Sequence, residues 1–530
     1  MGAPSLFGGT MSVRPLQQSI APTGPDVARS PAVDGPPEVG PDVLRAERAW
    51  CEGEPLVAID AVDRALASGG DVDGRAAAVA AAVAAADGAL LDAARRWRVL
   101  ARTLTSTRSA LAAGRAGLTA ALAGDVDAAV RDLAAAHACV PEPAPRGLIV
   151  LLDGVEATIE AVKGEIDGAG RRLAGLATTA VPPDPLASDR WDDLAAVVIA
   201  AGGDARSAQA MLGHPDRPDR PWYGRHRLLA GWLDLRTGRL TAARAALTAV
   251  GGAPVLRRDA VLAAAVTAGL ARRSGDERVI TTTWHRVAPV IAGADIEILL
   301  LDAWGELATA AATGSLADGD AIGEAMHATV TRAGSPWWAV ASEAWWNLER
   351  AVTARGPAPA AERPAPGAAA VVADAARTLT SLASDHPGVA LRAEAASTWG
   401  AVLTGCASAP AVARAATRLA AAGHHQEAAA LCSTAAARAI DPMSAKALLG
   451  QARRVCAQAG ARRRTVGDEL SDREREIGAL VIDGLTHKQI GAKLYISPKT
   501  VEQHVARLRQ KLDASNRAAL VAALRRRLDD

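Results

Sequence analysis

The chain has 530 residues, a formal net charge of +1 and a 50% share of hydrophobic residues. This length suffices for a large core or several domains, and the near-zero charge excludes a protein that binds nucleic acid along its whole surface. The charge is unevenly spread, however. Residues 461–530 hold 15 lysines and arginines against 10 acidic residues, a net of +5, while the rest of the chain carries a net of −4.

Five cysteines are scattered without metal-ligand spacing: Cys51, Cys139, Cys406, Cys432 and Cys456. Their odd number favours free thiols in a reducing compartment. The first residues lack the basic and apolar regions of a secretory signal, and no apolar run is long enough to span a bilayer. We therefore expect a cytoplasmic protein, and the alanine- and arginine-rich composition suggests a bacterial source.

The organisation along the chain follows from composition. Residues 1–43 are rich in Gly, Pro and Ser and are predicted to form a disordered leader. Residues 44–354 carry almost continuous helical patterning, and residues 368–460 form the rear part of the same helical region. The stretch RGPAPAAERPAPG between them, residues 355–367, is predicted to be a proline-rich linker or long loop.

One local pattern recurs through the helical region: a glycine is followed five positions later by an alanine, at the start of a helix. The pairs are Gly53/Ala58, Gly88/Ala93, Gly124/Ala129, Gly164/Ala169, Gly203/Ala208, Gly238/Ala243 and Gly423/Ala428. The first six glycines are spaced 35 to 40 residues apart, which resembles the period of tetratricopeptide-type helix pairs. We expect the glycine in the turn and the alanine where the second helix packs closely. An irregular helical bundle is the alternative.

The pattern fades after Gly275, where Ile280 takes the alanine position. Four tryptophans further on share one helix face, at spacings of seven to eight: Trp337, Trp338, Trp345 and Trp346. This face favours core packing between helix pairs over an aromatic ligand surface.

Residues 486–512, THKQIGAKLYISPKTVEQHVARLRQKL, contain two helix starts. Thr486 and Gln489 have the spacing of a capping box. Ser497 suits the N-cap of a second helix, and Pro498 its first position, where no backbone N–H is needed. Two short helices joined by a tight turn form a helix-turn-helix, whose second helix typically enters the major groove of DNA.

The second helix has two distinct faces. Val501, Val505, Leu508 and Leu512 fall on one narrow stripe that should pack on the domain. The opposite face holds Lys499, Gln503, Ala506 and Gln510, flanked by Glu502, Arg507 and Arg509. It is polar and positive, and the small Ala506 permits a close approach to base edges. An ordinary amphipathic surface helix is the alternative.

The flanking sequence completes a four-helix domain over residues 465–530. Ser471 and Glu474 have capping-box spacing, and Gly484 suits the end of that helix. A fourth helix is predicted from Asn516, with an apolar side formed by Leu520, Val521 and Leu524.

This domain resembles the LuxR-type helix-turn-helix of the NarL/FixJ group. The matched residues are Leu470, Ser471, Arg473, Glu474, Gly484, Lys488, Ile490, Leu494, Ile496, Ser497, Thr500, Val501, His504, Lys511, Leu512 and Arg517. The chain departs from the usual Asn-Lys-Glu-Ile-Ala by having HKQIG at residues 487–491, and it has Glu502 where a lysine is common. These departures bear on which DNA sequence is bound, since a carboxylate repels phosphate but can accept from cytosine.

The resemblance implies a DNA-binding transcriptional regulator. It places Lys488, Thr500, His504 and Lys511 on the phosphate side, and Glu502, Gln503 and Ala506 toward the bases. It also implies a homodimer on double-stranded DNA, paired partly through Leu520, Val521 and Leu524. Some of that apolar patch must also cover the domain's own helices.

Several features of regulators and enzymes are missing. The G-x-x-x-x-G-K-[ST] loop that cradles nucleotide phosphates in large LuxR-type regulators does not occur. The all-helical front does not fit a receiver domain. The adjacent His424 and His425 are expected in a solvated turn, with no metal site. We predict no cofactor and no enzymatic activity.

The sequence thus predicts an all-α fold, with tetratricopeptide-like repeats (an α-solenoid) followed by a LuxR-type domain. We predict a regulator of transcription whose repeats receive a protein partner or a small-molecule effector. The alternative is a helical-repeat interaction scaffold, with DNA binding as a secondary, localising activity. An enzyme with catalysis hidden in the helical region ranks third.

Overall fold

The computed structural model describes residues 39–212, 223–252, 254–314, 319–354, 367–466, 472–494, 498–511, 514 and 516–528. Every regular element within these ranges is a helix, which confirms the all-α prediction. Two compact units are present, Met1–Val455 and Cys456–Asp530, and each has its own hydrophobic core. Among the described helices, none has both the length and the apolar composition that crossing a membrane requires.

Two predictions fall largely outside these ranges. The leader predicted over residues 1–43 is described only from residue 39, and the first helix already begins at Pro41. Of the predicted linker over residues 355–367, only Gly367 is described. The helices before and after that segment belong to the same compact unit and share one core.

The first unit holds the following elements, with α22 running on beyond it. They are α1 (Pro41–Cys51), α2 (Pro55–Ala67), α3 (Arg75–Asp87), α4 (Leu90–Thr103), α5 (Ser106–Leu122), α6 (Val126–Ala138), α7 (Arg146–Lys163), α8 (Ile166–Ala177), α9 (Trp191–Ala201), α10 (Ala205–Met211), α11 (Tyr223–Arg236), α12 (Leu240–Val250), α13 (Arg257–Ser274), α14 (Glu277–Ile291), η2 (Ile298–Leu300), α15 (Leu301–Thr313), α16 (Gly319–Arg332), α17 (Trp337–Thr353), α18 (Ala368–Ala383), η3 (Pro387–Val389), α19 (Ala390–Thr404), α20 (Ala409–Ala421), α21 (His425–Arg438) and α22 (Pro442–Val466).

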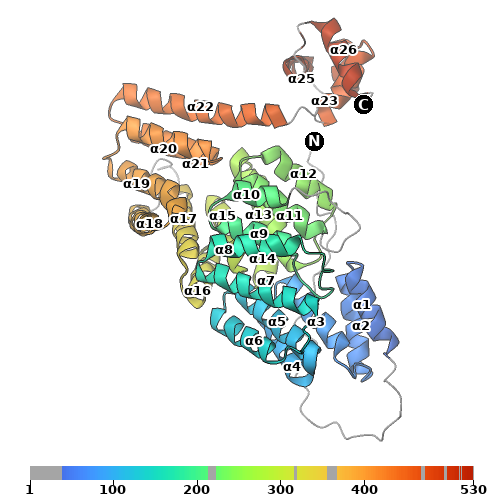
Figure 1. The fold of residues 1–530 in the computed structure, drawn as a ribbon. Coiled ribbons are helices and arrows are strands. Elements are labelled where there is room, and N and C mark those ends of the chain that lie inside the picture. Colours follow the sequence, from blue (N-terminus) through green and yellow to red (C-terminus); the bar gives the residue numbers. More distant parts are fainter. Residues whose placement is uncertain are drawn as a thin grey trace, which may run out of the picture. The chain divides into compact units, whose positions relative to one another are not determined.

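The helices of this unit pack in a regular order. Neighbours in the chain pack on one another, as α5 does on α6, α7 on α8 and α11 on α12 (Figure 1). Helices two apart also make contact, so that α5, α7, α9, α11, α13, α15 and α17 follow one another as a continuous layer. Helices α4, α6, α8, α10, α12, α14, α16 and α18 pack against this layer, each beside its neighbours in sequence.

The recurrent glycine marks a turn between two helices. All seven glycines have positive φ values, for example 77° at Gly238 and 102° at Gly423. The alanines five positions later are all 0% exposed: Ala58, Ala93, Ala129, Ala169, Ala208, Ala243 and Ala428. After Gly275, Ile280 occupies the same place and is 2% exposed, and α13 still packs on α14. The pairing of helices therefore continues where the alanine pattern fades.

Segments far apart in the sequence contact one another within the first unit. Helix α3 packs on α13, and the indole N–H of Trp338 in α17 donates to the carbonyl oxygen of Ala161 in α7 at 3.0 Å. The turns at Gly238 and Gly423 meet, and a Cβ placed on Gly238 would lie 3.0 Å from the Gly423 carbonyl oxygen. At this contact there is no room for a side chain.

Three of the four tryptophans and His425 lie in this packed interior, whereas Trp337 and His424 are half-buried. Trp338, Trp345 and Trp346 are buried in the core, as the packing interpretation predicts. The solvated turn predicted for His424 and His425 is wrong, because the turn at Gly238 covers it: His425 is 9% exposed. Burial lowers the pKa of His424 to about 4.

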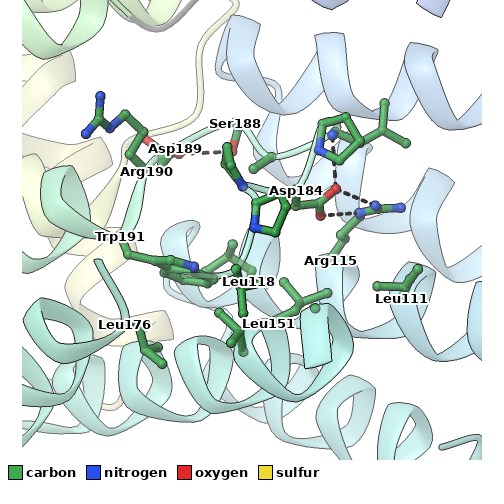
Figure 2. A pocket seen from close by; sticks show the side chains of 18 of the residues that line it. Leu111, Arg115, Leu118, Leu151, Leu176, Asp184, Ser188, Asp189, Arg190 and Trp191 are labelled. Atoms are coloured by element: carbon green, nitrogen blue, oxygen red, sulfur yellow. Dashed lines mark hydrogen bonds and ion pairs between the residues drawn. The ribbon is translucent and has the colours of Figure 1, made fainter. Parts of the chain in front are cut away.

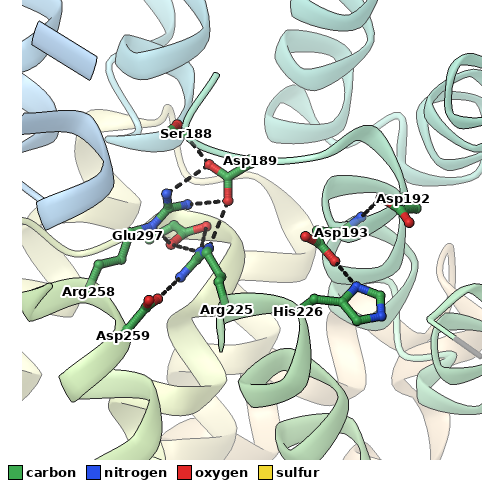
Figure 3. A network of polar contacts seen from close by, with 9 residues as sticks. All are labelled: Ser188, Asp189, Asp192, Asp193, Arg225, His226, Arg258, Asp259 and Glu297. Atoms are coloured by element: carbon green, nitrogen blue, oxygen red, sulfur yellow. Dashed lines mark hydrogen bonds and ion pairs between the residues drawn. The ribbon is translucent and has the colours of Figure 1, made fainter. Parts of the chain in front are cut away.

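Buried charges tie the connection between α8 and α9 to the helices beyond it (Figure 3). Asp189, on that connection, accepts from Arg225 of α11 and from Arg258 of α13, each at 2.8 Å. The same two guanidinium groups reach Glu297 at 2.9 and 2.8 Å. Burial alone would raise the pKa of Asp189, but Arg258 and Arg225 outweigh it and hold that pKa below its ordinary value. Arg225 also pairs with Asp259 of α13 at 3.3 Å, so five side chains form a buried ion-pair cluster that joins four segments: the connection, α11, α13 and the residues before η2.

We predict that Gly238→Ala lowers the melting temperature more than Gly275→Ala does. Both positions have a left-handed backbone, with φ of 77° and 71°, so both substitutions cost about 1 kcal/mol in strain. A Cβ at Gly275 has no atom within 4 Å, whereas one at Gly238 meets the Gly423 backbone, which adds ~1–3 kcal/mol of overpacking. Thermal unfolding followed by circular dichroism measures the difference. Equal losses at the two sites would contradict a close contact between the turns.

Candidate nucleic-acid interface

Four short helices build the second unit around a small apolar core. They are α23 (Asp472–Ile482), α24 (His487–Leu494), α25 (Pro498–Lys511) and α26 (Arg517–Leu528). Helix α23 contacts the other three, and α24 packs on α25. The core residues are Ile477, Leu480, Val481, Ile490, Val501, Val505, Leu508, Ala514, Leu520 and Leu524.

The predicted capping box at the start of α24 is present. The backbone N–H of Thr486 donates to Gln489 Oε1 at 2.9 Å, and the N–H of Gln489 donates to Thr486 Oγ1 at 3.4 Å. Helix α25 begins at Pro498, as predicted. Its predicted N-cap, Ser497, lies outside the described residues. The start of α24 and its direction are thus set by the side chains of Thr486 and Gln489.

The end of α23 also has the predicted form. Gly484 has a φ of 81°, and the N–H of Leu485 donates back to the carbonyl oxygen of Leu480 at 3.1 Å. Arg517 at the start of α26 donates to the carbonyl oxygen of Leu485 at 2.8 Å, which ties α26 to this turn. The capping box predicted with Ser471 and the side chain of Glu474 falls outside the described part of the domain.

The start of α26 is capped as well. Asn516 Oδ1 accepts from the N–H of Ala519 at 2.8 Å, which satisfies one of the donors left over at a helix start. The fourth helix predicted from Asn516 is therefore confirmed.

Helix α25 divides into a buried stripe and an exposed face. Val501 and Leu508 are 0% exposed and Val505 is 8% exposed, as the periodicity predicts. Leu512 lies outside the described residues. On the other side, Lys499, Glu502, Gln503, Ala506 and Arg509 are exposed. An elongated polar face with one small residue, Ala506, near its middle is what a helix needs to approach base edges in a groove.

Among the remaining predicted contact residues, the structure describes the side chains of Lys488, Thr500, His504 and Arg509. Lys488 on α24 is exposed, and Thr500 and His504 are half-buried. Arg509 donates from Nε to the carbonyl oxygen of Ala514 at 3.3 Å, so it also holds the segment after α25. The side chains of Arg507 and Lys511 lie outside what the structure describes.

One further exposed cation lies on these helices outside the predicted contact residues. Lys493 is exposed on α24, close in sequence to the turn before α25. Together with Lys488 and Lys499 it gives the exposed surface of α24 and α25 three lysines. The concentration of four of the chain's six lysines in residues 486–512 was the signal that could have identified it.

The structure divides the apolar patch predicted for dimerisation. Leu520 and Leu524 are 0% exposed and belong to the domain's own core, where Leu524 packs against Gly478 of α23. The prediction of these two as contact residues is therefore corrected, because neither has surface to offer a partner. Val521 is half-buried and keeps part of its surface.

Comparisons with known proteins match a short part of the chain, and the family model places its match in this unit. Residues 468–524 match the model described as "Bacterial regulatory proteins, luxR family". The "Probable transcriptional regulatory protein NarL" of Mycobacterium tuberculosis is 48% identical over 66 residues, which are 12% of this chain and 31% of that protein. The "Spore germination protein GerE" of Bacillus subtilis is 40% identical over 57 residues, or 11% of this chain and 77% of that protein. The chain thus spans about a third of the NarL protein and most of GerE.

Proposed function

The chain belongs to the luxR family of bacterial regulatory proteins, and from this we propose that it regulates transcription by binding double-stranded DNA. The observation that carries the proposal is α25: Val501, Val505 and Leu508 fix one side in the core and leave Lys499, Gln503 and Ala506 exposed on the other. A helix held in this way can enter the major groove without giving up its packing. The name of the NarL relative describes a transcriptional regulatory protein, which agrees with this role.

Phosphate contacts and base contacts would come from different residues. We assign Lys488, Ser497, Lys499, Thr500 and His504 to the DNA backbone, together with Arg507, Arg509 and Lys511. Glu502, Gln503 and Ala506 would face the bases. A glutamine can bind adenine through two hydrogen bonds, and a glutamate can accept from cytosine.

We predict that Lys488→Ala weakens binding to every duplex by a similar factor. Each lost phosphate contact should lower the slope of log affinity against log salt by about 0.9. Binding of the full chain to duplex DNA, titrated at several salt concentrations, measures this. Lys446→Ala, at an exposed lysine of the first unit, is the matched control and should leave the slope unchanged. Absence of any salt-dependent binding by the wild type would refute the proposed function itself.

We predict that Gln503→Ala relaxes the preference at one base pair, at ~1–3 kcal/mol, and leaves the salt slope as it was. Its side chain is exposed on the outer face of α25, so its removal leaves the domain core intact. Selection of bound sequences from a random library, compared between wild type, Gln503→Ala and Lys488→Ala, separates base reading from phosphate contact. An identical sequence preference in wild type and Gln503→Ala would show that Gln503 does not contact a base.

We further propose that two chains bind DNA together through α26. A single α25 presents few base-reading side chains, and two half-sites about one helical turn apart would double them. The pairing surface must be the part of α26 left outside the core, and Val521 is the larger of the two half-buried apolar side chains described there, beside Ala519. Such an interface is two-fold symmetric, so one substitution changes both sides.

We predict that Val521→Glu abolishes two-chain complexes on an inverted-repeat duplex while single-chain binding persists, because it sets two carboxylates against each other. The fragment 465–530 suits this test, since the unit has its own core and GerE is little longer than the matched segment. Sedimentation counts protomers per duplex, with Ala479→Glu on the exposed side of α23 as the control. Leu524→Glu is unsuitable, because it would place a charge in the core. One protomer per site for the wild-type fragment would contradict the dimer.

The first unit, we propose, receives the signal that controls DNA binding. Its layered helices provide an extensive surface, and the segment that matches the luxR family model, residues 468–524, lies in the other unit. Both a protein partner and a small molecule are consistent with such a layer.

A further inference from the structure

A cavity of about 740 Å³ lies within the first unit, bordered by α4, α5, α7 and the connection between α8 and α9 (Figure 2). This volume falls in the range of sites that enclose a small organic ligand. No group of the proposed DNA-binding surface takes part in it. The cavity therefore stands as a separate feature of the molecule.

The walls of the cavity are mostly apolar. Helix α5 contributes Leu111 and Leu118, α7 contributes Leu151, α8 contributes Leu176, and Trp191 starts α9 (Figure 2). Leu118, Leu151 and Leu176 are buried, which fixes these parts of the wall in the core. A ligand in this space would move most of its surface out of water and into contact with apolar side chains, which favours binding if that surface is apolar.

Charged side chains also line the cavity: the pairs Arg115–Asp184 and Arg190–Asp192, Asp189 with its two buried arginines, and Arg146, which is exposed to solvent. Arg115 of α5 and Asp184 of the connection are joined by two hydrogen bonds, at 2.8 Å from Nε and 2.6 Å from Nη2, and their side chains are 13% and 18% exposed. The Arg115 guanidinium also lies 5.0 Å from the ring centroid of Trp97. The Arg115–Asp184 pair is neutral as a whole, so it can offer hydrogen bonds to a ligand without favouring a full charge.

The connection that closes the cavity is unusually long. It runs from residue 178 to residue 190 without a helix, whereas α7 and α8 are joined by Gly164 and Glu165 alone. Long connections without secondary structure in a compact unit are commonly functional. Here the backbone is further restricted by Pro182, Pro183 and Pro185.

This connection is held at three points. The indole N–H of Trp50 donates to the carbonyl oxygen of Pro185 at 2.7 Å, and Asp184 is bound to Arg115. Asp189 is held by the buried arginines of α11 and α13 (Figure 3). A site fixed in this way loses little freedom when a ligand enters, which favours affinity.

We infer that this cavity is a binding site for an uncharged, mostly apolar small molecule that carries at least one hydrogen-bonding group. The apolar walls would bind its body, and the Arg115–Asp184 pair would meet its polar group. The inference deepens the proposed role of the first unit as the receiver of a signal. It does not rest on DNA binding, because it is tested without DNA.

The test uses the full chain and the neutral fluorophore N-phenyl-1-naphthylamine, which brightens in apolar surroundings. We expect saturable binding of one molecule per chain, with energy transfer from Trp97 and Trp191. Leu111→Trp fills the cavity from α5 and should weaken binding at least tenfold. Leu56→Trp, at a leucine of α2 that is 57% exposed, is the matched control and should bind as wild type does.

Two further arms keep the outcome decisive. Val150→Phe narrows the cavity from α7, so it replaces Leu111→Trp if that variant melts at a lower temperature than the control. The anionic fluorophore 1-anilinonaphthalene-8-sulfonate should bind more weakly than the neutral one. Undiminished binding in both cavity variants, absence of saturable binding, or preference for the anionic probe would each overturn the inference. None of these results would contradict the proposal that the protein binds DNA.

Discussion

Close backbone contact between distant turns is the constraint on which the first unit depends. The turn at Gly238 meets the turn at Gly423, and a Cβ on Gly124 would lie 3.2 Å from the carbonyl oxygen of Thr329. The same glycines end helices with a left-handed residue, so each serves the local turn and the distant contact. Because glycine has no side chain at these contacts, the distant segments can approach closely, and the fully buried alanines five positions later let the paired helices pack together.

Charged groups are buried where distant segments meet. Arg257 of α13 donates from Nε to Asp87 of α3 at 2.6 Å, across 170 residues of sequence. Burying such groups costs free energy unless each is paired. An arrangement that leaves one of these charges buried without its partner is therefore destabilised. The network around Asp189 has the same character and adds a consequence, since it positions the connection that borders the cavity. The ion-pair cluster around Asp189 thus also holds one wall of the candidate binding site in place.

On the proposed function, the second unit separates packing from DNA recognition on a single helix. Val501, Val505 and Leu508 hold α25 in place, and the exposed side chains on its other face take no part in that core. Residues such as Glu502 and Gln503 can therefore differ from those of relatives without loss of the fold. If the exposed face reads bases as proposed, this independence lets one domain architecture bind different DNA sequences.

The sequence by itself determined what depends on neighbours a few residues apart. The capping box of Thr486 and Gln489, the start of α25 at Pro498 and the turn glycines are local, since a helix end is satisfied by groups within one turn. Only the tertiary structure decided what depends on distant segments. Leu524 and Val521 look alike in sequence, but Gly478 on another helix makes room for Leu524 alone. The burial of His425, the partners of Asp189 and the cavity likewise arise from elements far apart in the chain, whose approach no local pattern encodes.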